Sequence, residues 1–168
     1  GANHGFFSLH ALDKGASKIY AIEPVKETFN ILTKLTEKFP EITRIEKAVT
    51  DKTGTVHMDI TDNRSATNHL QKYDNIFTSG GNTTQVSSIE INELLDSIQP
   101  VNYIKIDCEG SEYEIFKNID VSKIDKVGRI VCEVHGEEID KFVYSRLLEL
   151  GFTVKRRENI LYAFKKVD

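Results

Sequence analysis

The sequence has few cysteines and no arrangement that would use them as a framework. Cys108 and Cys132 are the two cysteines among the 168 residues, and their spacing fits neither a zinc site nor a set of disulfides. Both lie in apolar segments, so we expect two buried, reduced thiols in a cytoplasmic protein. No apolar run approaches the roughly 20 residues that span a membrane, and the chain shows no secretory signal pattern. We therefore expect no membrane partner.

The sequence also lacks an excess of positive charge. Its formal net charge is −4, and it has no Lys/Arg-rich arm, so nucleic acid is not expected as a partner. Apolar residues make up 39% of the chain and charged residues 29%, which is typical of a globular domain. A chain of this length buries one core, and we expect a single domain over residues 1–168. Nothing in the composition indicates an oligomeric state.

Apolar periodicity predicts helices and strands that alternate along the chain. The predicted helices cover residues 6–14, 27–39, 91–98, 112–119 and 139–150. The predicted strands cover residues 18–22, 42–49, 55–60, 85–89, 101–107, 129–135, 152–156 and 160–164. Alternation is typical of an α/β fold with a mostly parallel sheet and helices on both faces. The last two strands, joined by a turn at Glu158 and Asn159, predict a closing antiparallel hairpin.

One stretch interrupts the alternation. Residues 61–84 are polar and rich in turn-forming residues, and we interpret them as a long, mobile insertion. In an enzyme, such a segment would serve as a lid or as an acceptor-binding element. The strand at 55–60, which follows a turn at 51–54, is expected to return along an edge of the sheet.

The chain opens with a loop, Gly1-Ala2-Asn3-His4-Gly5, directly before the first predicted helix. Two glycines let a ligand approach the backbone closely, although a purely structural turn is the alternative. Glu23 follows the next strand, where an acidic residue can accept hydrogen bonds from ribose hydroxyls. The alternative there is a surface glutamate. Asp51 could bind an adenine amino group, or Ala48 and Val49 could line the adenine ring. The alternative is that Asp51 simply opens a turn.

A dense group of charged residues lies at 105–112, at the end of a strand that we expect to be central. Lys105 and Asp107 point to the same side of that strand, and we expect them to pair, because a buried unpaired charge is costly. Glu109 and Glu112 open the following helix, where carboxylates suit the positive end of the helix dipole.

Glu133 and His135 end the next predicted strand. Neighbouring parallel strands would bring His135 close to Asp107, and a histidine at the rim of a sheet is a natural general base. A second hypothesis uses the same region to hold a divalent cation, with Asp107, Glu109, Glu133 and His135 as candidate ligands. The residues alone leave both hypotheses open.

Five blocks of sequence resemble the FkbM-type methyltransferases, and they occur in the order of that family. The blocks cover residues 1–8, 22–24, 48–54, 104–114 and 131–135. The resemblance implies a Rossmann-like, three-layer class I fold and an S-adenosylmethionine-dependent O-methyltransferase that acts on a hydroxyl of a small molecule or glycan. It also implies that Gly1, Ala2, Asn3 and Gly5 hold the methionine part of the cofactor, that Glu23 holds the ribose, and that Asp107 lies near the methyl group.

Family members carry a strand just before the glycine block, and this sequence does not, so we expect the chain to be N-terminally incomplete. Methyl transfer is an in-line displacement in which the enzyme mainly aligns the reactants. We expect His135 or Asp107 to act as the base, with the other orienting it and Lys105 beside them. A bound cation that polarises the hydroxyl is the variant mechanism.

Two alternatives come from other functional classes. The first is a catalytically silent binding module that keeps the fold. The second is an NAD-dependent oxidoreductase, against which the lack of the G-x-G-x-x-G fingerprint argues.

Overall fold

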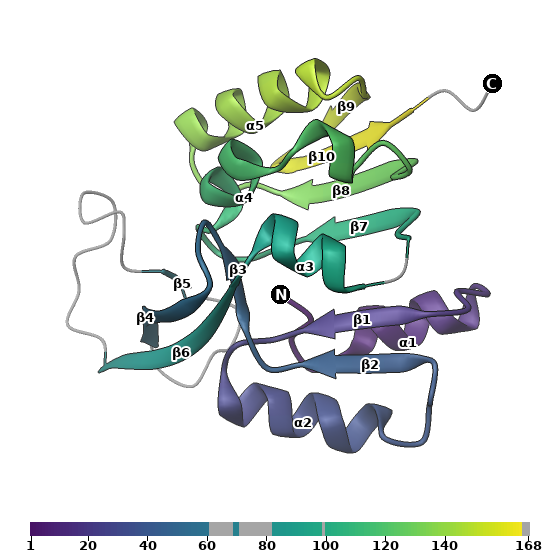
Figure 1. Cartoon of the computed structure of the whole chain (residues 1–168), viewed down its shortest axis with the longest axis vertical. Helices are drawn as coiled ribbons and strands as arrows, with labels where there is room; N and C mark the ends of the chain where they lie inside the picture. The colour runs from purple at the N-terminus through teal and green to yellow at the C-terminus, as the bar shows by residue number, and fades with distance from the viewer. Residues whose placement is uncertain (61–68, 71–81, 99, 166–168) are drawn as a thin grey trace. The chain divides into compact units, whose positions relative to one another are not determined.

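The computed structural model describes residues 1–60, 69–70, 82–98 and 100–165, and its helices and strands alternate as the sequence predicts. The helices are α1 (Phe6–Asp13), α2 (Lys26–Thr36), α3 (Ile91–Ser97), α4 (Glu112–Asn118), α5 (Glu137–Glu149) and the short 3₁₀ helix η2 (Val121–Lys123) (Figure 1). The strands are β1 (Ile19–Ile22), β2 (Ile42–Ile45), β3 (Ala48–Thr50), β4 (Gly54–Ile60), β5 (His69–Leu70), β6 (Asn82–Glu90), β7 (Tyr103–Ile106), β8 (Arg129–Glu133), β9 (Thr153–Arg157) and β10 (Ile160–Phe164).

The described residues group into two compact units. The first unit contains residues 1–48 and 53–88, and the second contains residues 49–52 and 89–168. The expectation of a single domain over 1–168 stays a prediction.

In the first unit, β1 and β2 form a parallel ladder in which Ile19 faces Ile42 and Ile22 faces Ile45. A small core of Ala21, Leu32 and Ile42 joins this ladder to α2. The helix α2 ends at Thr36, three residues before the predicted end. The reason is that the Thr36 carbonyl accepts hydrogen bonds from Arg44 Nη1 at 3.0 Å and from the Phe39 amide at 3.0 Å, instead of continuing the helical pattern.

The predicted strand at 42–49 is in fact two strands. The chain leaves the β1–β2 ladder after Ile45, and β3 joins a different sheet of order β3-β6-β4-β5. In that sheet β4 lies between β6 and β5, so the expected edge position of the strand at 55–60 is wrong. The break falls at the two charged residues Glu46 and Lys47, which lie between the two strands.

The predicted insertion at 61–84 lies largely outside the described residues. Within its limits, however, His69–Leu70 form β5, and β6 begins at Asn82 rather than at residue 85. Antiparallel pairing with β4 extends β6, with Thr84 opposite Met58 and Thr83 opposite Asp59. Threonine is β-branched and suits an extended strand once a partner strand is present.

The second unit is built on a sheet of order β7-β8-β10-β9. The β7–β8 ladder is parallel, whereas β10 pairs antiparallel with both β8 and β9. The closing hairpin is therefore confirmed, and β10 lies between β8 and β9. The α/β class is confirmed as well. A mostly parallel sheet is not confirmed, because β4 also pairs antiparallel with β5 and β6.

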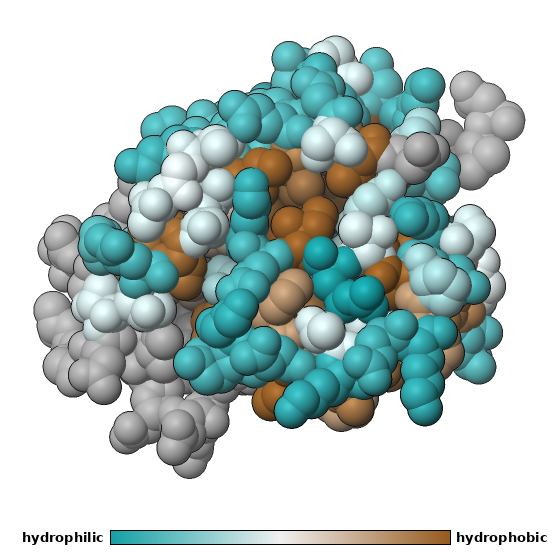
Figure 2. Space-filling view, turned by 60° about the horizontal axis from the view of Figure 1, so that its bottom comes forward, coloured by the Kyte–Doolittle hydropathy of each residue, from teal (hydrophilic) through white to brown (hydrophobic). Residues whose placement is uncertain are grey.

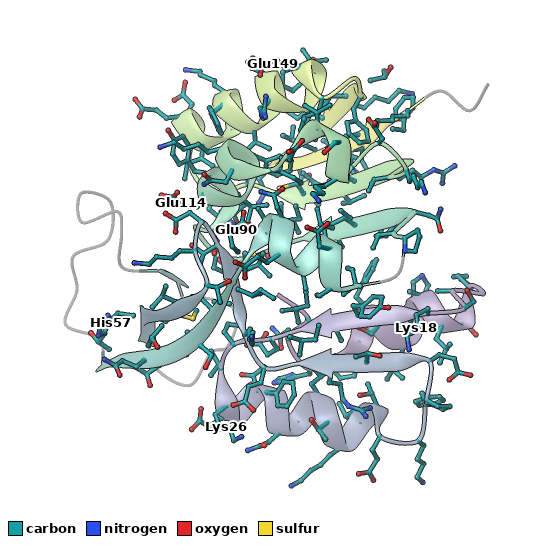
Figure 3. The ribbon with its side chains drawn as sticks, in the orientation of Figure 1. Lys18, Lys26, His57, Glu90, Glu114 and Glu149 are labelled. Atoms are coloured by element: carbon teal, nitrogen blue, oxygen red, sulfur yellow. The ribbon has the colours of Figure 1, made fainter. Side chains whose placement is uncertain are left out.

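The helices α4 and α5 pack on the sheet of the second unit (Figure 1). Its core takes fully buried side chains from both helices and from β8 and β10, among them Phe116, Val143, Ile130 and Leu161. Glu90 lies at the start of α3 (Figure 3), where its side chain accepts hydrogen bonds from the amides of residues 92 and 93 and caps the helix.

The surface is mixed in polarity. Hydrophilic residues cover much of the face drawn in Figure 2, and apolar side chains show between them, as is usual for a folded domain. No described helix combines the length and the apolar character needed to cross a membrane.

The two cysteines are both free thiols, as predicted. Cys132 is fully buried on β8, and burial holds the pKa of its thiol well above the usual value. Cys108 is only partly buried, which corrects the expectation of two buried thiols. It lies in the loop after β7.

Candidate functional site

The glycine loop of the first unit is tied to the end of β1. The Ala2 amide donates to the Ile22 carbonyl at 2.8 Å, and the Gly5 amide donates to the Ala2 carbonyl at 2.9 Å. Gly1 is exposed at the start of the loop, and Asn3 has a positive φ of 50°. The predicted loop is therefore a tight turn held against the strand.

Gly5 is required by both its backbone and its surroundings. Its φ is +89°, and a Cβ atom placed there would lie 2.5 Å from Leu32 Cδ1 of α2. Any side chain at this position would strain the backbone and collide with the core of the first unit. The close approach of α1 to α2 thus depends on this glycine.

Glu23 is buried directly beside this loop, so the alternative of a surface glutamate is wrong. Its side chain is 6% exposed. One carboxylate oxygen accepts a hydrogen bond from the Asn3 amide at 3.0 Å, and the other accepts from the Val25 amide at 3.1 Å. The carboxylate therefore fixes the glycine loop relative to the start of α2. Each oxygen keeps a further lone pair that can accept another hydrogen bond.

Asp51 belongs to the second unit and follows β3. Its Oδ1 accepts a hydrogen bond from the Thr50 hydroxyl at 3.0 Å, in a series of bends that lead into β4. This arrangement fits the turn interpretation. The role in binding adenine stays a prediction.

Lys105 and Asp107 form the pair that the strand period predicts. Lys105 Nζ lies 2.7 Å from Asp107 Oδ2, and both side chains are mostly buried. Asp107 follows the last residue of β7. The parallel β7–β8 ladder then brings His135, just after β8, to the same end of the sheet.

His135 lies between two carboxylates. Its Nδ1 lies 3.2 Å from Glu112 Oε1, and its Nε2 lies 3.2 Å from Glu109 Oε2. Ligand atoms of Asp107, Glu109 and His135 all lie within 4.8 Å of one another. The prediction that His135 comes close to Asp107 is confirmed.

Glu133 is more peripheral than the sequence suggests. Its Oε1 is 3.9 Å from His135 Nε2 and accepts a hydrogen bond from Asn159 Nδ2 at 2.9 Å. The strand β8 ends at Glu133, two residues earlier than predicted, and the next amide, that of Val134, donates to the Asn159 carbonyl at 2.9 Å. Glu133 is thus tied to the hairpin turn.

Glu112 is the residue of this site that the sequence reasoning missed. It is fully buried and accepts hydrogen bonds from the Gly110 amide at 2.8 Å and the Cys108 amide at 3.2 Å, as well as contacting His135. Its place in the first turn of α4 matches the helix-dipole interpretation but does not explain its burial. The spacing Glu109-Gly110-Ser111-Glu112, with a turn glycine just before the helix, is the signal that could have indicated it.

These contacts shift the proton equilibria of the site. The hydrogen bond to Glu112 raises the pKa of His135 from 6.5 to about 9, and the nearby charges of Glu109 and Glu133 contribute, although burial opposes the shift. Burial raises the pKa of Glu109, and the neighbouring His135 partly offsets this rise. At neutral pH the His135 ring is therefore mostly protonated, and it can act as a base or bind a metal ion only after it loses that proton.

The comparisons with known proteins agree with this α/β architecture. The methyltransferase FkbM domain matches residues 1–154, so the chain belongs to the FkbM methyltransferase family. This confirms the resemblance that the sequence blocks indicate. No curated protein matches the chain significantly.

The chain is also similar in structure to the methyltransferase FkbM from Methylobacillus flagellatus KT. The TM-score is 0.66 at 17% sequence identity, and the match covers 98% of this chain and 42% of that one. At this identity the likeness concerns the fold. The chain spans less than half the length of that protein.

Proposed function

We propose that this chain is the cofactor-binding core of an S-adenosylmethionine-dependent O-methyltransferase with a Rossmann-like class I fold, acting on a hydroxyl of a small molecule or sugar. The observation that carries the proposal is the buried Glu23 carboxylate beside the glycine loop, in a chain of the FkbM methyltransferase family. The loop backbone would hold the methionine part of the cofactor, and Glu23 would accept hydrogen bonds from the ribose hydroxyls.

In the proposed reaction, the acceptor oxygen attacks the methyl carbon as the carbon–sulfur bond breaks. The products are a methyl ether and S-adenosylhomocysteine, and the hydroxyl proton passes to a base. Aligning the acceptor with the methyl group supplies much of the rate. The base is His135 or Asp107, with Lys105 held by its contact with Asp107.

The pH dependence of the reaction separates these two bases. Because the pKa of His135 is raised to about 9, a reaction that uses His135 as the base accelerates with pH until the imidazolium has lost its proton. The measurement is kcat/KM against pH, with S-adenosylhomocysteine as the detected product. A profile that stays flat between about pH 7 and pH 10 would rule out His135 as the base and would leave Asp107 as the candidate.

The first test is calorimetric titration of the chain with S-adenosylmethionine and, separately, with NAD. We expect S-adenosylmethionine to bind and NAD not to bind. Glu23→Gln should weaken binding about tenfold or more, because the charge that attracts two ribose hydroxyls is lost. The matched control is Glu27→Gln, which removes an exposed carboxylate from the first turn of α2 and should leave the affinity unchanged.

The other outcomes decide between the functional classes. Binding of NAD alone would favour the oxidoreductase and overturn the methyltransferase proposal. If the folded protein bound neither S-adenosylmethionine nor NAD, the proposal that this chain binds the methyl-donor cofactor would also be overturned. Binding of S-adenosylmethionine without methyl transfer to any of a panel of sugars and hydroxylated small molecules would favour the silent binding module.

A further inference from the structure

Three potential metal ligands converge at one end of the sheet in the second unit. Asp107 follows β7, Glu109 lies in the next loop, and His135 follows β8. One ligand atom from each lies within 4.8 Å of the other two. The residues come from two adjacent strand ends, so the β7–β8 ladder fixes their spacing.

The distances suit a single ion. Bonds of about 2.1 Å in octahedral coordination place neighbouring ligand atoms about 3 Å apart and opposite ones about 4 Å apart. His135 Nε2 and Glu109 Oε2 are separated by 3.2 Å, which matches neighbouring positions. The side chains of all three residues are about one-quarter exposed, so water or a substrate hydroxyl has access to the remaining positions.

The imidazole is held so that the correct nitrogen faces the cluster. Glu112 Oε1 lies 3.2 Å from His135 Nδ1, which leaves Nε2 directed at Glu109. Glu112 itself is fully buried and is fixed by the amides of Gly110 and Cys108. A carboxylate that accepts the other ring N–H is the usual support of a metal-bound histidine.

The local charge also favours a cation. The carboxylates of Asp107, Glu109, Glu112 and Glu133 lie around His135, and Lys105 pairs with Asp107. Carboxylates crowded at a partly buried site repel one another, and a divalent ion offsets that repulsion.

We propose that Asp107, Glu109 and His135 bind a divalent transition-metal ion, and that Glu112 positions the imidazole for it. One nitrogen and two carboxylate ligands favour Zn²⁺ over Mn²⁺ in affinity, and both over Mg²⁺. The proposal does not rest on the proposed function, because the ion binds without cofactor or acceptor. In a methyltransferase the ion would polarise the acceptor hydroxyl.

The test is calorimetric titration of chelator-treated, dialysed chain with Zn²⁺ and with Mn²⁺. We expect one ion per chain. Bound Co²⁺ should give a visible absorption spectrum that changes on loss of the histidine ligand. Glu109→Gln, Asp107→Asn and His135→Gln should each weaken Zn²⁺ binding at least a hundredfold. Glu112→Gln should weaken it by about ten- to a hundredfold, because it acts only through the imidazole.

Two controls define specific binding. His57→Gln removes an exposed histidine of the first unit, and Glu138→Gln removes an exposed carboxylate from α5; neither should change the affinity. The absence of stoichiometric binding by the unmodified chain would overturn the proposal. The proposal would also be overturned if Glu109→Gln and Asp107→Asn bound Zn²⁺ as tightly as the unmodified chain does, since the ion would then bind elsewhere. Circular dichroism establishes that each variant is folded.

Titration with S-adenosylmethionine on the same metal-free protein keeps the two proposals separate. Cofactor binding without metal binding would overturn only the metal site. Metal binding without cofactor binding would overturn only the proposed function.

Discussion

Replacing Glu112 with glutamine tests how strongly one buried charge organises this site. The substitution keeps the shape of the side chain but removes the negative charge that contacts His135 Nδ1 and the amides of Gly110 and Cys108. We expect the pKa of His135 to fall from about 9 towards 6.5, because the hydrogen bond to Glu112 is the main cause of the rise.

The magnitude follows from this shift. A rise in pKa from 6.5 to about 9 corresponds to about 3 kcal/mol of stabilisation of the charged ring. The His135 side chain is 26% exposed, and solvent screening reduces this to about 2 kcal/mol. Weaker hydrogen bonds from the two amides add about 1 kcal/mol. We therefore expect Glu112→Gln to lower the free energy of unfolding by about 3 kcal/mol at pH 7.

The pH dependence has a definite sign. A histidine whose pKa is higher in the folded than in the unfolded state stabilises the fold fully below pH 6.5, and this stabilisation is lost as the pH rises through about 9. The difference between the unmodified chain and Glu112→Gln should thus shrink to about 1 kcal/mol near pH 10.

The assay is urea unfolding followed by circular dichroism at pH 7 and pH 10, in the presence of a chelator. NMR titration of the imidazole gives the pKa directly. Glu138→Gln, in the exposed first turn of α5, is the control for loss of a helix-terminal carboxylate. The reasoning would be refuted if the free energies of unfolding of the unmodified chain and Glu112→Gln differed by the same amount at both pH values. A His135 pKa near 6.5 in the unmodified chain would refute it as well.

Two further predictions concern backbone fit and thiol chemistry. Gly5→Ala should lower the free energy of unfolding by about 2–3 kcal/mol, because a Cβ atom at this position meets Leu32. Gly15→Ala, with a similar positive φ but open surroundings, should lower it by about 1 kcal/mol. Urea unfolding that gives equal losses for the two variants would contradict this prediction. A thiol reagent should modify Cys108 in the folded chain and Cys132 only after unfolding, because burial keeps the Cys132 thiol neutral and inaccessible. Equal reaction rates of the two thiols in native buffer would show that β8 opens.

Much of the candidate site could be predicted from short-range patterns. The two-residue period of a strand is enough to pair Lys105 with Asp107, and the expectation of adjacent parallel strands is enough to bring His135 near Asp107. The position of Glu23 directly after a strand indicates that it lies beside the glycine loop, and the hydrogen bond that its carboxylate accepts from the Asn3 amide confirms this.

The sequence by itself determined the α/β class, the order of the elements and the closing hairpin, because helix and strand periods and turn residues are local properties of the chain. Only the tertiary structure decided that residues 42–49 divide between two sheets and that β6 extends back to Asn82, because partner strands settle both. It alone decided that Glu112 is buried against His135 and raises the pKa of that ring. A carboxylate at the first turn of a helix looks the same in a sequence whether it faces water or an imidazole, and the difference arises from residues 23 positions apart that folding brings together.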